Sequence, residues 1–306
     1  MRKYLVIGVS LFLLALISLN ASAITASQIG ANQIVNTVNN SENWAGVAYS
    51  VEWWTDGIFN HWGVVQSAWD YIYVGNLSLG YISQPGYSYP DEVAIWVGLS
   101  PAQIGYGAGA SSGEEKTSFV QAGYIIGVTP SGNFIQYFVF TFNNGQELNY
   151  YEQNIPAGTV TRLDVSLSNL ENGTAMAQFF VVYSNGATWT TKVYESIPWT
   201  LTGSAMSIVE APLSTYGGFY YELPYMSGGM INFNFAYIGE DGNEHTGPST
   251  NPSGTIYADV YQIGGSSVYN SALAEIYNGW PYSSYGGWSY LYQFSYSWLS
   301  VTSDGL

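Results

Sequence analysis

Two polar side chains interrupt apolar stretches of this chain. Gln121 lies in the run F-V-Q-A-G at 119–123, and Glu210 lies in the run S-I-V-E-A-P at 207–212. A glutamate can exchange protons, and a glutamine amide can both donate and accept hydrogen bonds. The chain has no cysteine and only two histidines with which to build another catalytic centre. The Gln/Glu pair is therefore the first candidate for chemistry.

Composition excludes most other kinds of site. His61 and His245 are far apart in the sequence, so no zinc site and no Ser/His or Cys/His centre is predicted, and both are expected to be surface or hydrogen-bonded residues. Nucleic acid is excluded as a partner because phosphate neutralisation requires clusters of basic residues. The chain has five such residues: Arg2, Lys3, Lys116, Arg162 and Lys192. We therefore expect neither a metal nor a cofactor.

The first 23 residues are typical of an export signal. Arg2 and Lys3 precede an apolar run at 4–19, and Ala21-Ser22-Ala23 is a small-residue cleavage site. We expect cleavage after Ala23 and a secreted protein. The alternative is an uncleaved segment, in which case the protein would contact a membrane.

The charge balance favours an acidic exterior. Loss of the signal leaves 3 basic and 21 acidic residues, a net charge of 3 − 21 = −18 with histidine neutral, and charged residues are 8% of the chain. Few ion pairs can form, so acid breaks little and reduces self-repulsion. The alternative is an acidic secreted protein that acts at neutral pH. Without disulfides, stability must come from packing in a core that a chain of about 280 residues can bury.

The local pattern is almost entirely that of β-strands. Aromatic and β-branched residues alternate with polar ones in short runs, separated by Asn-Gly and Asp-Gly turns. The predicted strands are 47–53, 62–74, 93–99, 118–128, 134–142, 160–167, 175–183, 188–194, 204–209, 230–238, 255–261 and 288–298. The best candidate for a helix is the short segment 271–277. The spacing predicts an all-β antiparallel sandwich or barrel.

We expect one domain and no internal linker. The predicted organisation is a signal peptide at 1–23, a short N-terminal segment at 24–40, a single domain at 41–300 and a tail at 301–306. Within the domain, 103–116 reads as a Gly/Ala/Ser-rich loop before the Gln121 strand. Sequons at Asn39, Asn76 and Asn172 predict N-glycans on exported loops.

Four short motifs resemble those of a known family. They are N-W-A-G at 43–46, I-W-V-G at 95–98, V-Q-A-G at 120–123 and I-V-E-A-P at 208–212. In order and rough spacing they resemble the glutamic peptidases (eqolisins) and their archaeal and bacterial relatives. The resemblance implies a two-sheet antiparallel β-sandwich of the concanavalin-like or jelly-roll type. It also implies that Gln121 and Glu210 form a catalytic dyad on its concave face.

The resemblance assigns roles to both residues. Glu210 would take a proton from water and then return it, while Gln121 would hold the water and donate to the oxyanion. These roles need no metal and predict a secreted acid endopeptidase that acts on extended polypeptides. Trp44, Trp96, Ser100 and Thr141 are the candidate substrate-binding residues, although tryptophans in such a chain also serve as core.

The sequence departs from the family pattern at two places. Ser100 follows the W-V-G motif where Asp or Gly is frequent, and Thr141 stands where a supporting glutamate is expected. Tyr150-Tyr151-Glu152 would supply that glutamate after a shift of register. These departures favour one alternative, a catalytically inactive surface protein of the same fold.

Other readings remain open at this stage. Gln121 and Glu210 could be polar residues on the solvated face of their strands, where alternation puts every second residue. A carbohydrate-binding or lectin-like sandwich would explain many exposed aromatic residues without any catalytic glutamate. A glycosidase would need two carboxylates about 5 to 10 Å apart, for which no closely spaced motif is visible.

Overall fold

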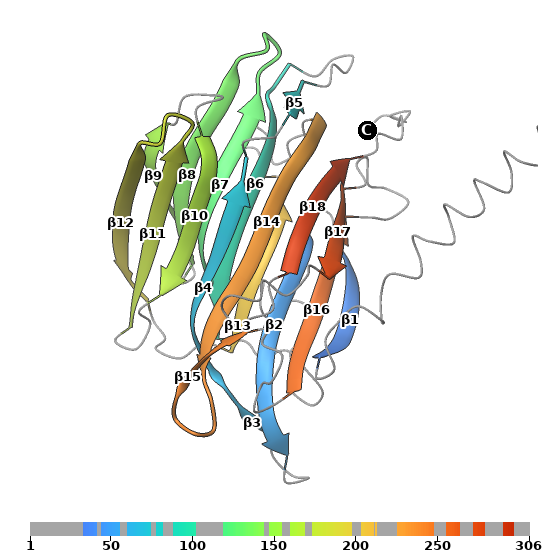
Figure 1. Ribbon diagram of the computed structural model, residues 1–306, viewed down its shortest axis with the longest axis vertical. Helices are drawn as coiled ribbons and strands as arrows, with labels where there is room; N and C mark the ends of the chain where they lie inside the picture. The colour runs from blue at the N-terminus through green and yellow to red at the C-terminus, as the bar shows by residue number, and fades with distance from the viewer. Residues whose placement is uncertain are drawn as a thin grey trace, which may run out of the picture.

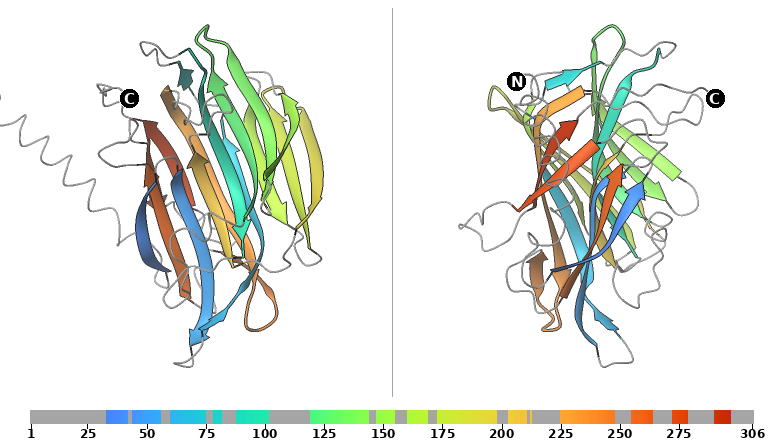
Figure 2. Two further views of the ribbon diagram at one scale, coloured as in Figure 1. Left: turned by 180° about the vertical axis from the view of Figure 1, so that it is seen from behind. Right: turned by 90° about the vertical axis from the view of Figure 1, so that its right-hand side faces the viewer.

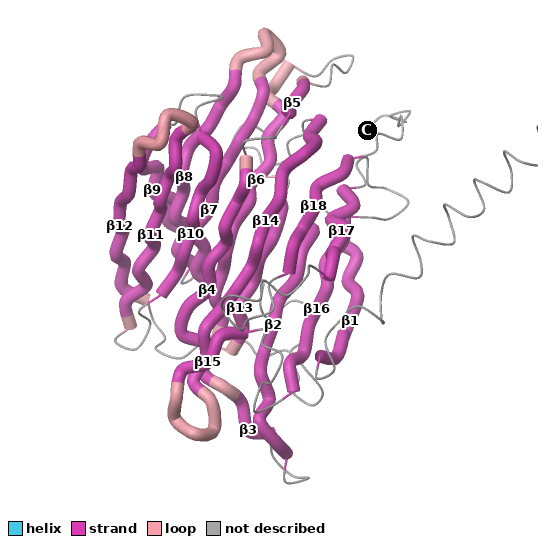
Figure 3. The backbone as a smooth tube through the Cα atoms, in the orientation of Figure 1, coloured by secondary structure: helices cyan, strands magenta, loops and turns pink. Residues whose placement is uncertain are grey.

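The computed structural model describes most of the chain from residue 33 onward. The described residues are 33–41, 44–55, 60–74, 78–81, 88–101, 119–143, 147–154, 160–168, 173–197, 203–210, 212, 225–247, 255–263, 272–278 and 290–296. All regular structure within them is β-strand (Figure 3). They contain no helix long and apolar enough to cross a membrane. The predicted signal segment, the 103–116 loop and the 301–306 tail lie outside the described residues.

The strands form two sheets that stack face to face (Figures 1 and 2). Sheet A has the order β1 (Gln33–Ser41), β16 (Thr255–Ile263), β2 (Trp44–Thr55), β13 (Ser204–Glu210), β6 (Asp91–Ser100), β7 (Val120–Val128), β8 (Phe134–Asn143) and β9 (Glu147–Asn154), with β3 (Asn60–Trp62) on β2. Sheet B has the order β12 (Thr188–Ser196), β11 (Thr174–Tyr183), β10 (Val160–Ser168), β4 (Val64–Tyr73), β14 (Tyr225–Ile238), β18 (Tyr290–Tyr296) and β17 (Ala272–Asn278). Its strand β14 also carries β15 (Glu244–Gly247) and β5 (Ser78–Gly80).

The predicted all-β, antiparallel two-sheet sandwich is confirmed. Neighbouring strands pair antiparallel throughout the described sheets except for β1 and β16, which pair in parallel. The first strand begins at Gln33, inside the segment that was expected to precede the domain.

The core lies between the two sheets. Sheet B shows the simple rule of alternation, since every second residue of β11 is buried and the intervening ones are half-exposed. Aromatic rings fill the gap: Phe138 stacks on Phe179 at 4.7 Å, and Tyr49 stacks on Phe235 at 5.8 Å. Burying one such large apolar side chain stabilises the fold by roughly 1.5–3 kcal/mol.

Two predictions about local structure are wrong. The segment 271–277 is not a helix, because β17 occupies Ala272–Asn278 and pairs antiparallel with β18. Its Ala, Leu and Glu residues favour a helix locally, but pairing along a whole neighbouring strand overrides that preference. Asn39 lies in β1, opposite Tyr261 of β16, and not in a loop. Asn76 and Asn172 lie outside the described residues.

Candidate active site

The register of sheet A places Gln121 and Glu210 on one face. Glu210 of β13 pairs with Ala94 of β6, and Gln121 of β7 pairs with Gly98 of β6. Residues 94 and 98 share a parity along β6, so their partners point to the same side of the sheet. Trp96 shares that parity and lies between them. The three side chains therefore follow one diagonal across β13, β6 and β7.

This face of sheet A, here called the outer face, is turned away from the core but is not a solvated surface. It carries its own buried apolar cluster: Trp44, Ala48, Ala94, Trp96, Ile125, Val139, Met206 and Ile208, with Phe119 and Tyr137 packed against it. Strand β6 is accordingly buried at all ten positions, on both faces. Gln121 and Glu210 are half-buried polar side chains at the border of an apolar surface. Gln121 and Glu210 are therefore not on a solvated strand face, which was the alternative that alternation allowed.

Trp96 is the central residue of the face. Its Nε1 donates a hydrogen bond of 2.7 Å to Oε2 of Glu210. The ring of Trp44 meets the Trp96 indole edge-on at 5.1 Å, and Phe119 stacks on it at 5.8 Å. Trp96 is only 1% exposed, so this aromatic packing fixes the position of the indole. The indole in turn holds the carboxylate of Glu210.

Two glycines of the sequence motifs make room for this indole. A Cβ on Gly98 would lie 2.7 Å from Cζ3 of Trp96, and a Cβ on Gly123 would lie 2.8 Å from Cβ of Trp96. Gly98 follows Trp96 in the W-V-G motif, and Gly123 follows Gln121 in the Q-A-G motif and pairs with Trp96 across the strands. The glycines of both motifs therefore make space for the same indole ring.

Gln121 has an unsatisfied acceptor. Its Oε1 is buried and has no hydrogen-bond partner among the described residues. Leaving such a group unpaired costs about 1–3 kcal/mol, so buried acceptors of this kind are normally satisfied by protein, water or ligand. The oxygen is a ready acceptor for a water or a substrate group.

The two groups of the predicted dyad are not in direct contact. Gln121 and Glu210 are separated by two inter-strand spacings, about 10 Å, across the sheet and by four residues, about 13 Å, along it, so their backbones lie roughly 16 Å apart. No hydrogen bond joins the two side chains within the described part of the chain. Their joint action requires a water and a substrate group between them.

The predicted substrate-binding residues all lie on this face and all are buried. Trp44 and Trp96 form the aromatic centre described above. Thr141 of β8 pairs directly with Gln121, and Ser100 lies two residues beyond Gly98, opposite Ser204 of β13. Their roles stay predictions. The alternative glutamate, Glu152, lies in β9, whose side chains are outside those that the structure describes.

Two buried carboxyl groups on this face, those of Glu52 and Glu92, were not predicted from the sequence, and Glu92 lies nearer to Glu210. Glu92 has the parity of Trp96 on β6 and lies two residues before Ala94, the partner of Glu210. Such diagonal neighbours are about 7–8 Å apart in the backbone. Glu92 is 7% exposed, and burial raises its pKa to about 7. Counting back by twos from Trp96 would have found it.

His245 is hydrogen-bonded, as predicted. His245 Nε2 hydrogen-bonds Oδ1 of Asp241 at 2.9 Å, and its ring stacks on Tyr237. Within the described residues, no group of three or more His, Asp or Glu side chains is arranged to hold a metal ion.

Comparison with known proteins gives matches among solved structures alone. No family model matches the chain, and no curated protein matches it. Scytalido-glutamic peptidase with a peptide-based transition-state analogue matches with 14% identity and a TM-score of 0.47, over 83% of this chain and 98% of that one. SCP-B, described as a member of the eqolisin family and solved with the tripeptide Ala-Ile-His, matches with 13% identity and a TM-score of 0.45 over the same shares.

A weaker structural match is to an enzyme of a different class. An alginate lyase solved with an alginate trisaccharide is 15% identical, with a TM-score of 0.30, over 64% of this chain and 83% of its own. Glutamic peptidases are thus among the solved structures to which this chain is similar.

Proposed function

We propose that the protein is a secreted, acid-active endopeptidase of the glutamic type. The observation that carries the proposal is the diagonal on the outer face of sheet A, with Glu210 and Gln121 on either side of Trp96 and Glu210 hydrogen-bonded to the indole. The buried Oε1 of Gln121 has no hydrogen-bond partner among the described residues, so this amide oxygen is available to a water or a substrate group. The four motifs that resemble glutamic peptidases contain these same residues.

Glu210 acts first as a base and then as an acid. Its carboxylate takes a proton from a water molecule, whose oxygen attacks the carbonyl carbon of the peptide bond. As the tetrahedral intermediate collapses, the C–N bond breaks and Glu210 returns the proton to the leaving amine. The Trp96 indole keeps the carboxylate oriented, because its Nε1 donates to Oε2 of Glu210.

Gln121 stabilises the charge that develops on the substrate. Its amide NH2 donates to the carbonyl oxygen as that oxygen becomes an oxyanion, while its Oε1 accepts from the attacking water. The buried and unsatisfied state of this oxygen fits such a role. The apolar cluster beside Gln121 limits the access of competing water, which strengthens both hydrogen bonds.

The test is hydrolysis by protein that lacks residues 1–23. We expect cleavage of an acid-denatured protein substrate at pH 3 to 4 that persists with inhibitors of serine, cysteine and metal-dependent peptidases. Glu210→Gln, purified in the same way, is the control and should be inactive while keeping its β-sheet circular dichroism. Equal cleavage by the wild type and by Glu210→Gln would assign the activity elsewhere.

One observation supports a second candidate. Glu92 and Glu210 are two carboxyl groups on one face at diagonal positions, the arrangement that a glycoside hydrolase needs. A carbohydrate-active sandwich would hydrolyse or bind neutral and acidic oligosaccharides and leave peptides intact. Incubation of the wild type with both substrate classes at acid pH separates the two functions.

A further inference from the structure

A carboxyl group in the core is not used by the proposed mechanism. Asp70 lies in β4, with Val165 of β10 and Phe233 of β14 as its backbone partners, and its side chain is 0% exposed. The hydroxyl of Ser207 donates to both of its oxygens, at 3.1 and 2.9 Å. Ser207 belongs to β13 of sheet A, so this polar contact crosses the core from one sheet to the other.

The contact lies directly behind the proposed catalytic strand. Ser207 points into the core, and Glu210, three residues further along β13, points to the outer face. Strand β13 has seven residues and lies between β2 and β6 in the middle of sheet A (Figure 1). The hydrogen bonds from Ser207 to Asp70 of sheet B therefore hold β13, the strand that carries Glu210, in position against sheet B.

The surroundings of Asp70 favour the neutral carboxyl. The inward side chains of the adjacent strands are apolar: Leu163, Val165 and Leu167 of β10, and Ile231, Phe233 and Phe235 of β14. The titratable groups that face the core from the packed elements are Asp91 of β6, Tyr49 of β2, Tyr124 of β7 and Tyr237 of β14. No Lys or Arg among the described residues faces it. Burial raises the pKa of Asp70 well above its usual value, and the Ser207 hydrogen bond opposes this to a smaller extent.

We propose that Asp70 is a positioning residue for β13, and that the Asp70–Ser207 contact is a latch between the sheets that is closed in acid and released when the carboxyl ionises. The catalytic half of this inference depends on the function proposed for Glu210, and the stability half does not. In acid the neutral group exchanges hydrogen bonds with Ser207. Once the proton has left for solvent, a carboxylate with one hydroxyl donor remains in an apolar core, a state that water entry or separation of the sheets relieves.

The sign of the pH dependence follows from the raised pKa. The folded protein holds the Asp70 proton at pH values where the unfolded chain has lost it. The free energy of unfolding therefore decreases as pH rises from the usual value of 3.8 through the folded value. If Glu210 is catalytic, the latch restricts activity to acid pH because it controls the position of β13.

Asp70→Asn tests the latch, because asparagine has the same shape, hydrogen-bonds Ser207 and does not ionise. We expect the decrease in melting temperature between pH 4 and pH 7 to be about half that of the wild type or less. We also expect the ratio of kcat/KM at pH 7 to that at pH 4 to rise about tenfold or more, since β13 keeps its place. Asp164→Asn on the exposed face of sheet B is the matched control and should leave both profiles unchanged. Profiles of Asp70→Asn that match those of the wild type would overturn the inference.

Amide hydrogen exchange of the wild type gives a test that needs no variant. Protection of the β13 amides should fall between pH 4 and pH 7, after correction for intrinsic exchange, before that of β11 in sheet B does. Equal changes in both strands would overturn the latch. If the protein proves to have no peptidase activity, the melting and exchange results still decide the stability half, so failure of the two proposals can be told apart.

Discussion

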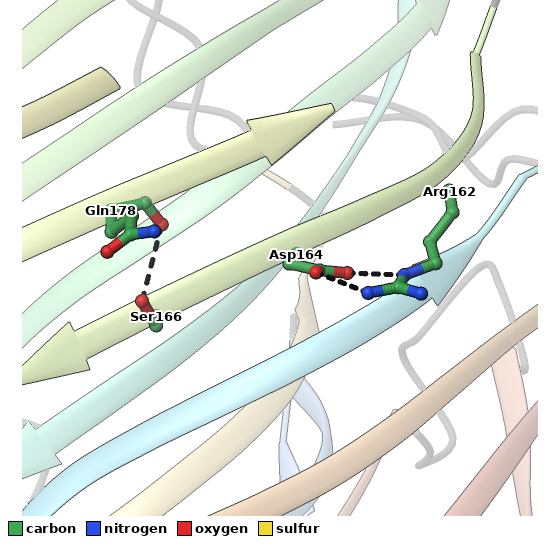
Figure 4. Close-up of polar contacts among 4 residues, drawn as sticks. All are labelled: Arg162, Asp164, Ser166 and Gln178. Carbon is green, nitrogen blue, oxygen red and sulfur yellow. Dashed lines mark hydrogen bonds and ion pairs between the residues drawn. The ribbon is translucent and has the colours of Figure 1, made fainter. Parts of the chain in front are cut away.

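The outer faces of the two sheets differ in how they treat polar residues. On sheet B, Arg162 forms an ion pair with Asp164 at 2.6 Å, and Ser166 Oγ lies 3.5 Å from the backbone carbonyl oxygen of Gln178 (Figure 4). The Arg162 guanidinium also lies over the ring of Tyr71. These side chains are part-exposed and satisfy one another at the surface. On sheet A, the corresponding face is an apolar cluster in which β6 is buried at every position.

The difference shows on which face a polar residue indicates function. On sheet B, alternation alone accounts for a polar residue at every second position, and its partners are its neighbours. On sheet A, Gln121 and Glu210 stand in surroundings that apolar residues would fill better, and the Gln121 oxygen is left unsatisfied. A polar group that costs stability where packing does not require it is a candidate for function.

Removal of the Glu210 carboxylate should have the largest effect on activity. Glu210→Gln keeps the shape and a group that can bond the Trp96 indole, but it cannot take a proton. We expect kcat to fall by about 10³-fold or more. The matched change on sheet B is Asp164→Asn, which should retain wild-type kcat. A similar loss in both variants would mean that the two faces do not differ in function.

Truncation of the Gln121 amide should have the next largest effect. Gln121→Ala should raise the barrier by about 2.7–4 kcal/mol if the amide is the main oxyanion donor, and kcat should fall more than KM rises. Gln178→Ala on sheet B should leave the kinetics unchanged. Should Gln121→Ala change KM alone, the residue would bind substrate without stabilising the transition state.

Glu92 should make the outer face of sheet A sensitive to pH. Because burial raises its pKa from 4.5 to about 7, the folded protein holds this proton where the unfolded chain has lost it. The free energy of unfolding should therefore fall as pH rises from about 4.5 to about 7, by about 3 kcal/mol at most. Denaturant unfolding of the wild type and of Glu92→Gln at pH 4 and pH 7 measures this. If the free energy of unfolding changes equally in both proteins between the two pH values, Glu92 does not titrate in that range.

Filling the space beside Trp96 should reduce stability and activity together. Gly98→Ala places a methyl group against the indole, and overpacking of this kind costs about 1–3 kcal/mol. Displacement of the ring also shifts the donor that holds Glu210, so kcat should fall. Gly186→Ala, in the open turn of a sheet B hairpin with φ of +82°, is the control: it should lower the melting temperature and leave kcat of the folded protein unchanged.

The smallest effect is expected at an exposed turn. Hydrogen bonds from Asn243 and then from His245 hold the pKa of Asp241 below its usual range. A lowered pKa means that the stabilisation is present at neutral pH and is lost as the pH falls, the reverse of the Glu92 case. Asp241→Asn should therefore reduce the melting temperature slightly at pH 7 and by less at pH 2, with no change in kcat. A loss of activity would make this turn part of the site.

The fold was predictable because most strands carry their own pattern. The alternation of β10 and β11 indicates one buried face, and the continuous apolar runs of β6 and β13 indicate strands covered on both sides. Strands β1, β3, β5, β9 and β15 were not predicted, and β17 was predicted as a helix, which its residues favour in isolation. Its strand structure depends on pairing with β18, which local sequence does not encode.

The site was predictable only in part. The motifs identified Gln121 and Glu210, and the register places them on one face. The bond between Trp96 and Glu210 joins residues 114 positions apart, and that between Asp70 and Ser207 joins residues 137 positions apart. Contacts of that kind depend on strand order and on the stacking of the sheets. The sequence analysis therefore gave Trp96 a general substrate or core role and did not single out Asp70.

A structure of Glu210→Gln with a slowly cleaved peptide at acid pH tests the central claim most directly. We predict that the peptide lies extended across the outer face of sheet A, with a backbone carbonyl oxygen within about 3 Å of the Gln121 Nε2. The side chain at 210 should lie within one bridging water of the same carbonyl carbon. The account would be contradicted by a peptide bound elsewhere. It would also be contradicted if no peptide carbonyl group lay within about 8 Å of both the Gln121 side chain and the side chain at position 210.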